Sequence, residues 1–185
     1  PMTAQVELLS INSPETHSAF NTPMACDLIA VIVDFAPTLS DTRVIVLTGS
    51  SDKALCAGGD LKERKAMSDQ KWQAQHLVYE RMIRAIIACP LPTIGAINGA
   101  AYGGGCELAA ALDFIYVSDN ARFAQTEVRI GIIPGAGGTQ TLARAIGEKR
   151  AKEMILTGQV FSAEDALNWG LANKVYPQNE LLQAT

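Results

Sequence analysis

Three short, almost continuously apolar segments constrain the fold of this chain more than any other feature. They span residues 43–48, 93–97 and 114–117, and each is bounded by glycine, proline or polar residues. Apolar runs of this length are typical of strands buried on both faces, as in a parallel sheet. Helical patterns lie between them, and this alternation predicts an α/β fold with largely parallel pairing.

The other predicted elements depend on capping and breaking residues. A strand is expected over residues 6–11 and a helix over 22–36, since Thr22 and Pro23 suit a first turn and Pro37 ends it. Further helices are expected over 70–88, 106–112, 135–146 and 149–156 and between Ser162 and Gly170, with a last strand at 175–176. No linker or fixed-period repeat divides residues 1–185, so we expect a single domain.

The composition narrows the class of protein. The 185 residues are 48% hydrophobic, which suits a sizeable core, and carry a net charge of -4, which gives no reason to expect an anionic membrane as partner. No apolar run reaches the roughly 18 residues of a membrane span, and the first residues lack a signal-peptide charge pattern, so a cytoplasmic location is expected. Four cysteines without a C-x-x-C pair are expected to be reduced, and two histidines predict no metal site.

Two glycine-rich turns can expose backbone N–H groups. Cys-Ala-Gly-Gly-Asp-Leu-Lys-Glu, at 56–63, follows a buried strand, and its Asp60 can cap the helix after it. Asn-Gly-Ala-Ala-Tyr-Gly-Gly-Gly-Cys-Glu, at 98–107, precedes a helix with Glu107 in its first turn. N–H groups at such turns suit a developing oxyanion, because no side chain blocks them and the helix dipole is positive there. Taken alone, either segment also fits ordinary glycine packing.

A third segment combines a glutamate with another glycine- and proline-rich turn. Phe-Ala-Gln-Thr-Glu ends at Glu127, and Gly-Ile-Ile-Pro-Gly-Ala-Gly-Gly-Thr-Gln follows at 131–140. A charged residue ahead of such a turn, taken alone, lies at the surface more often than not.

Together the three segments resemble, in the same order, the crotonase or enoyl-CoA hydratase/isomerase family, over nearly the whole chain. Gly-Gly-Gly-Cys-Glu and Pro-Gly-Ala-Gly-Gly-Thr-Gln are specific in combination, and the 20-residue interval from Glu107 to Glu127 matches that between the family's catalytic glutamates. The resemblance implies a spiral of strand-strand-helix repeats and an acyl-CoA thioester substrate. It also implies no cofactor beyond the substrate's coenzyme A, and assembly as a homotrimer or dimer of trimers.

The same resemblance implies roles for individual residues. The N–H groups of Gly59 and Gly104 would hold the thioester oxygen, Glu107 would activate the water that attacks Cβ, and Glu127 would give a proton to Cα. Contacts with substrate or CoA are expected from Ala57, Gly58, Asp60, Leu61, Lys62, Gly103, Pro134 and Gly135. Because isomerases of the family commonly work with one of the two glutamates, retention of both favours a hydratase that adds water syn across the 2,3-double bond.

Three alternatives remain open. One is an enoyl-CoA isomerase, and another is a methylglutaconyl-CoA-type hydratase, whose subgroup is resembled by the segment 56–64, ending in Lys-Glu-Arg. The third is a non-catalytic or RNA-binding homologue. The helix expected over 22–36 contains no Lys or Arg, and phosphate binding needs clustered positive charge, so we expect no nucleic-acid partner.

The chain departs from the family in two respects. Ser13, Thr16 and His17 replace charged residues that lie near the CoA phosphates in the family, and Lys62 and Arg64 are expected to supply part of that charge. Family members also continue into C-terminal helices that cover the acyl pocket and build the trimer. We therefore expect this C-terminal helical region to be missing from the chain, whose Leu181-Leu182 pair resembles the start of an element.

Overall fold

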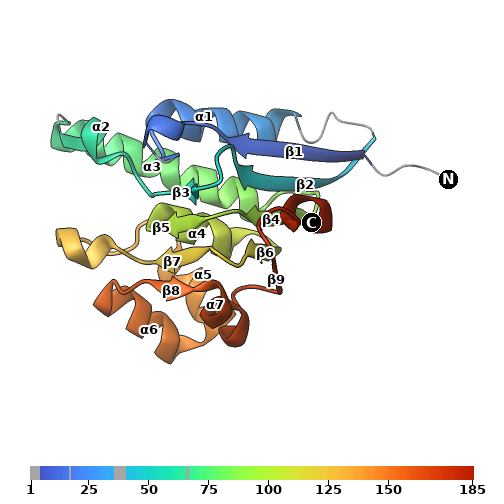
Figure 1. Cartoon of the computed structure of the whole chain (residues 1–185). Helices are drawn as coiled ribbons and strands as arrows, with labels where there is room; N and C mark the ends of the chain where they lie inside the picture. Colours follow the sequence, from blue (N-terminus) through green and yellow to red (C-terminus); the bar gives the residue numbers. More distant parts are fainter. Residues whose placement is uncertain (1–4, 17, 36–40, 66) are drawn as a thin grey trace.

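The computed structural model describes residues 5–16, 18–35, 41–65 and 67–185 (Figure 1). The larger of its two sheets has five strands in the order β1-β2-β4-β6-β9, and every neighbouring pair is parallel. These strands are β1 (Gln5–Ile11), β2 (Thr42–Gly49), β4 (Thr93–Ile97), β6 (Phe114–Ser118) and β9 (Lys174–Tyr176). The expected parallel α/β architecture is confirmed.

The smaller sheet is built from short strands that follow those of the larger one. Its order is β3-β5-β7-β8, with only the last pair antiparallel. These strands are β3 (Ala54–Cys56), β5 (Ala100–Tyr102), β7 (Arg122–Ala124) and β8 (Phe161–Ser162). Each of the pairs β2–β3, β4–β5 and β6–β7 leads into helical structure, so the chain winds as the expected strand-strand-helix spiral (Figure 1).

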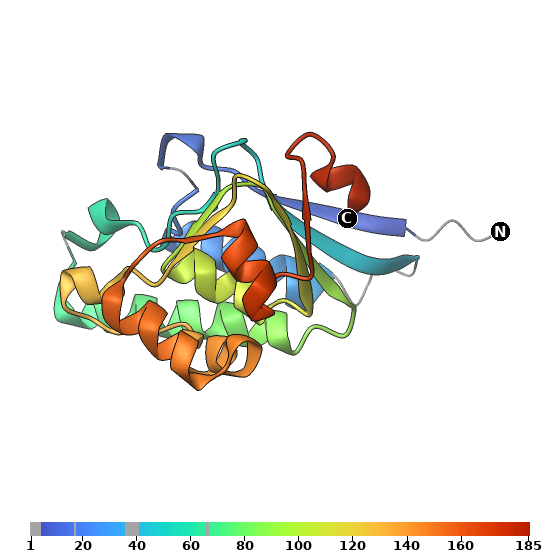
Figure 2. The same ribbon diagram turned by 60° about the horizontal axis from the view of Figure 1, so that its bottom comes forward.

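The helices cover mainly one side of the strands, as Figure 2 shows, whereas the last one lies on the other side. They are α1 (Thr22–Ala30), α2 (Leu61–Lys65), α3 (Asp69–Ile87), α4 (Gly104–Ala111), α5 (Gly138–Ile146), α6 (Glu148–Thr157), α7 (Ala163–Trp169) and α8 (Leu181–Ala184). Short turns of other helix types are η1 (Pro14–Thr16), η2 (Val31–Phe35) and η4 (Glu127–Ile130). None of the helices in the described part of the chain is both long and apolar enough to cross a bilayer.

The apolar strands are buried on both faces, which explains their continuous apolar sequence. In β2, Ile45 and Leu47 join the main core under the helices, while Val46 packs with Ala96 and Leu181 on the opposite face. Burial of such side chains stabilises the fold by roughly 1.5–3 kcal/mol each.

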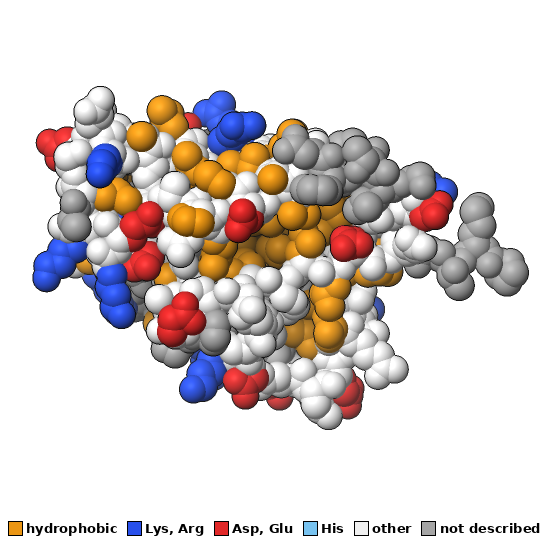
Figure 3. All heavy atoms as spheres, turned by 90° about the horizontal axis from the view of Figure 1, so that it is seen from above, with side chains coloured by type: hydrophobic (Ala, Val, Ile, Leu, Met, Phe, Trp, Pro, Cys, Tyr) orange, Lys and Arg blue, Asp and Glu red, His pale blue; other side chains and the backbone are white. Residues whose placement is uncertain are grey.

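Hydrophobic side chains also gather in a band on the face occupied by α1 and β1, seen from above in Figure 3.

Several element boundaries differ from the sequence-based expectation. Helix α1 ends at Ala30 and continues as a wider π-type turn, and residues 36 and 37 lie outside the described residues. Helix α5 begins at Gly138 rather than 135, because Gly137 has a φ of 98°, which is incompatible with a right-handed helix. Helix α4 begins two residues before the expected start, at Gly104.

Candidate active site

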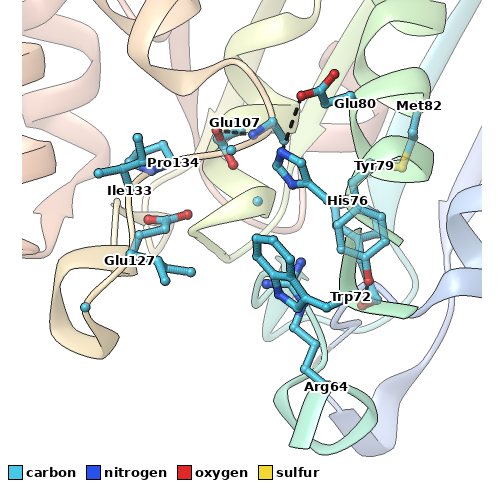
Figure 4. Close-up of a pocket in the computed structure, with 17 residues that line it drawn as sticks. Arg64, Trp72, His76, Tyr79, Glu80, Met82, Glu107, Glu127, Ile133 and Pro134 are labelled. Atoms are coloured by element: carbon cyan, nitrogen blue, oxygen red, sulfur yellow. Dashed lines mark hydrogen bonds and ion pairs between the residues drawn. The ribbon is translucent and has the colours of Figure 1, made fainter. Parts of the chain in front are cut away.

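One cavity of about 620 Å³ is lined by half of the residues that the sequence singles out as site residues, including both glutamates. Both glutamates and both glycine amides line it, together with Pro134 and Gly135; this set is Gly59, Gly104, Glu107, Glu127, Pro134 and Gly135. The opposite wall is helix α3, from which Trp72 and His76 project toward the glutamates (Figure 4). The three glycine-containing segments, far apart in the sequence, therefore meet at one place.

Glu107 is held by the backbone of the segment before α5. Its side chain is 2% exposed, and its Oε1 atom accepts hydrogen bonds from the N–H groups of Ala136 and Gly138, each 2.8 Å long. Burial raises the pKa of Glu107 to about 7, and the charge of Glu127 adds to that rise, while the two backbone bonds oppose it. The carboxyl group can therefore gain or lose a proton near neutral pH.

Local sequence explains how Glu107 reaches this position. Helix α4 packs directly on strand β3, since a Cβ atom at Gly105 would lie 2.2 Å from the carbonyl oxygen of Cys56. Only glycine permits that approach, and Glu107 follows two residues later in the first helical turn.

Glu127 is buried, which differs from the expectation for that segment taken alone. It begins η4, its side chain is 9% exposed, and its Oε2 atom has no hydrogen-bond partner among the described residues. Burial raises its pKa as well. The carboxyl group packs against Gly103, where a Cβ atom would lie 3.0 Å from Oε1 of Glu127 and where φ is 51°. A side chain at position 103 would occupy the space that this carboxyl group uses.

The amides of Gly59 and Gly104 are neighbours, and neither donates a hydrogen bond to another described residue. A Cβ atom at Gly104 would lie 3.9 Å from the nitrogen of Gly59. The N–H of Phe20 donates to the carbonyl of Gly58, and the carbonyl of Phe20 accepts from the N–H of Asp60, each at 2.7 Å. This parallel pairing points the N–H of Gly59, which lies between them, away from Phe20. Gly104 opens α4, where the first N–H groups have no partner within the helix.

The remaining predicted contact residues shape the first turn or lie outside the cavity lining. Asp60 caps α2, accepting the N–H of Lys62 at 2.8 Å, as expected. Gly58 has a φ of 99°. The structure does not bring Ala57, Gly58, Asp60, Leu61, Lys62 or Gly103 to the cavity surface, and the side chains of Leu61 and Lys62 are exposed.

The segment expected near the CoA phosphates is internally bonded. Ser13 donates to Oε1 of Glu15 at 2.8 Å, and Thr16 donates to Oγ of Ser13 at 3.0 Å. His17 lies outside the described residues.

Sequence reasoning missed Gln125, whose side chain is fully buried beside Glu107. A Cβ atom at Gly138 would meet Oε1 of Glu107 at 3.0 Å and Nε2 of Gln125 at 3.3 Å. Neither amide atom of Gln125 has a hydrogen-bond partner among the described residues. The sequence around it, Arg-Phe-Ala-Gln-Thr-Glu at 122–127, is mixed in polarity and gives no local signal that the amide is buried.

The sequence also did not predict that α3 forms a wall of the cavity, because its helical pattern does not indicate which face meets a ligand. Trp72 and His76 stack with ring centroids 5.5 Å apart, and Nε2 of His76 lies 3.3 Å from Glu80. A Cβ atom at Gly135 would lie 2.6 Å from the imidazole, so this glycine allows α3 to approach.

Comparisons with known proteins show the family of the chain. Residues 2–185 match the family model described as enoyl-CoA hydratase/isomerase. The short-chain-enoyl-CoA hydratase of Clostridium acetobutylicum is 38% identical over 96% of this chain and 68% of its own length. The mitochondrial enoyl-CoA hydratase of Pongo abelii is 41% identical over 96% of this chain and 60% of its own.

A solved structure of an enoyl-CoA hydratase has the same fold as this chain. The enoyl-CoA hydratase of Bacillus anthracis superposes with a TM-score of 0.93 at 38% identity, covering 97% of this chain and 69% of that one. The chain thus spans about two thirds of the length of these relatives. On the combined evidence of the matched family model, the relatives and the fold, this chain belongs to the enoyl-CoA hydratase/isomerase family of enzymes.

Proposed function

We propose that this protein hydrates a 2-enoyl-CoA thioester, adding water syn across the 2,3-double bond. The observation that carries the proposal is that one cavity is lined by two buried carboxyl groups and by two backbone amides that have no partner among the described residues. Relatives at 38% identity are named short-chain-enoyl-CoA hydratase and crotonyl-CoA hydratase, which supports the same reaction.

The amides supply the electrostatic part of the mechanism. Attack of water on Cβ places negative charge on the thioester oxygen in an enolate-like transition state. The N–H groups of Gly59 and Gly104 would donate to that oxygen without reorganising, and each such donor contributes roughly 10²–10³ in rate.

The glutamates supply the proton transfers. Glu107 removes a proton from the attacking water, and Glu127 delivers a proton to Cα on the same face. This requires one ionised and one neutral carboxyl group in the pair. Burial raises the pKa of both groups, which favours a pair that holds one proton. Positioned acid and base groups typically add about 10²–10⁴ in rate.

A product analysis tests the proposal. Crotonyl-CoA should lose its enoyl absorbance in the presence of the protein, and mass spectrometry should find a product heavier by one water. A 3-enoyl-CoA offered in parallel identifies an isomerase, because that reaction changes no mass. Rapid conversion of the 3-enoyl thioester without hydration of crotonyl-CoA would show that the protein is an isomerase and not a hydratase.

From the family resemblance we also infer assembly into trimers or dimers of trimers. Native mass spectrometry measures this directly, and a monomer that hydrates crotonyl-CoA would contradict it. The expectations of a cytoplasmic location and of no nucleic-acid partner stay predictions.

A further inference from the structure

His76 lies at the contact between helix α3 and the segment 134–138 that holds Glu107. A Cβ atom at Gly135 would lie 2.6 Å from Cε1 and 3.3 Å from Nδ1 of its imidazole. Apart from neighbours along the chain, the three atoms nearest to that position all belong to this ring. Gly135 is not among the glycines with a positive φ. The group that excludes a side chain at position 135 is therefore the imidazole and not the backbone conformation.

The imidazole is fixed by its neighbours on the same face of α3. Trp72, one helical turn earlier, stacks on it with ring centroids 5.5 Å apart and an interplanar angle of 2°. Glu80, one turn later, lies 3.3 Å from Nε2 and is itself 3.3 Å from the guanidinium group of Arg84 (Figure 4). Residues four positions apart are neighbours on a helix surface, so one stripe of α3 presents a fixed ring to Gly135.

The segment that His76 contacts also carries the donors that hold Glu107. The N–H groups of Ala136 and Gly138 each donate a 2.8 Å hydrogen bond to Oε1 of Glu107, and Ala136 directly follows Gly135. Such bonds favour the ionised carboxylate, and these two lower the pKa of Glu107 against the effect of burial. A displacement of this segment would therefore change both the position and the proton affinity of Glu107.

We propose that His76 is a positioning residue for Glu107. Its imidazole packs against Gly135 and thereby keeps the two donating amides in place. This role depends on the shape and fixed orientation of the ring and involves no proton transfer by the imidazole. The inference rests on the proposed function, because the reaction rate reports the position of Glu107 only if this carboxyl group takes part in hydration.

The kinetics of crotonyl-CoA hydration by His76→Ala, Gly135→Ala and the double variant test the contact. Each single variant should lose roughly 10- to 100-fold in kcat, because small misplacements of reacting groups are costly. KM should stay close to the wild-type value, because the proposed role is not in substrate binding. The double variant should lose no more than His76→Ala alone, since Gly135→Ala no longer meets the imidazole. Gln73→Ala, at an exposed position of α3 outside the cavity lining, is the matched control and should keep the wild-type kcat.

Titration of the Glu107 carboxyl group, followed by carbon-13 NMR, tests the same contact without any reaction. The resonance of this group is identified by its loss in Glu107→Gln. In both single variants its pKa should rise by up to about one unit, the effect of weakening a charge-assisted hydrogen bond. Gly135→Ala keeps the imidazole, so a rise in that variant cannot come from loss of the charge of the histidine. Glu127 on η4 and Arg64 on α2, whose charges also act on Glu107, stay in place in all the variants.

The two measurements separate this inference from the proposed function. A wild-type protein that hydrates no enoyl-CoA, with the titration shifts present in both variants, would refute the proposed function and support the role of His76. An unshifted Glu107 titration in both single variants would overturn the assignment of His76, as would additive losses of kcat in the double variant. A raised KM with unchanged kcat in His76→Ala would also overturn it, because the residue would then be a substrate contact.

Discussion

The backbone N–H of Gly138 donates a 2.8 Å hydrogen bond to Oε1 of Glu107 and holds that carboxyl group against the start of helix α5. The same glycine leaves room for the glutamate, because a Cβ atom at position 138 would lie 2.9 Å from Cγ of Glu107. The orientation of Glu107 thus depends on a residue 31 positions away in the sequence.

Gly138→Ala should therefore displace Glu107 and lower kcat for crotonyl-CoA by roughly 10- to 100-fold, since small misplacements of reacting groups are costly. The fold should persist, because Gly138 is the first residue of α5 and has no positive φ. Steady-state kinetics measure the effect, with exposed Thr139→Ala as the control. Wild-type kcat in Gly138→Ala would show that the orientation of Glu107 does not depend on this contact.

Glu107→Gln should stabilise the protein at high pH. Burial raises the pKa of Glu107 from 4.5 to about 7, so the folded state binds a proton more tightly than the unfolded state. The contribution of Glu107 to folding stability is therefore greatest below pH 4.5, and it is lost as the pH rises through about 7. Glutamine cannot ionise, and its gain in unfolding free energy at pH 8 should reach at most about 3 kcal/mol. Urea unfolding at pH 5 and pH 8 measures this, and a gain that does not grow with pH would contradict the raised pKa.

The pH profile of kcat/KM should be bell-shaped. Burial raises the pKa of both carboxyl groups, and that of Glu107 to about 7, so one limb should lie near pH 7. The two apparent pKa values belong to the pair and not to either glutamate alone. Initial rates with crotonyl-CoA across this range measure the profile. A profile with both limbs at the ordinary glutamate pKa of 4.5 would show that burial does not control the pair.

The oxyanion donors can be tested at Gly104 without removing a side chain. Proline is tolerated at the first position of a helix, where it removes the N–H group, so Gly104→Pro deletes one donor. Its kcat/KM should fall by about 10²–10³. Gly104→Ala keeps the donor, and its Cβ atom would meet Phe20 at an ordinary 3.6 Å, so it should lose much less. Equal losses in the two variants would argue against the N–H group as the cause.

The sequence predicted the larger sheet well and the smaller sheet poorly, for a physical reason. Strands such as β4 bury both faces and so are continuously apolar, whereas β3, β5 and β7 have three residues each and show no periodicity. The turn motifs predicted exposed backbone N–H groups in two glycine-rich segments, and the family resemblance singled out Gly59, Gly104 and Glu107 within them. The burial of Glu127 depends on η4 folding against Gly103, and the position of Arg64 depends on Gln75 of another helix. Neither contact leaves a pattern in the local sequence, because each joins residues that are far apart along the chain.

The central claim is that Glu107 and Glu127 together hydrate the enoyl thioester. The most direct measurement is the rate of crotonyl-CoA hydration by the wild type, Glu107→Gln and Glu127→Gln, with folding checked by circular dichroism. Each glutamine variant should lose about 10²–10⁴ in kcat, and the double variant should lose little more than the worse single one, because the two groups act together in one addition step. Hydration at the wild-type rate by either single variant would contradict the account.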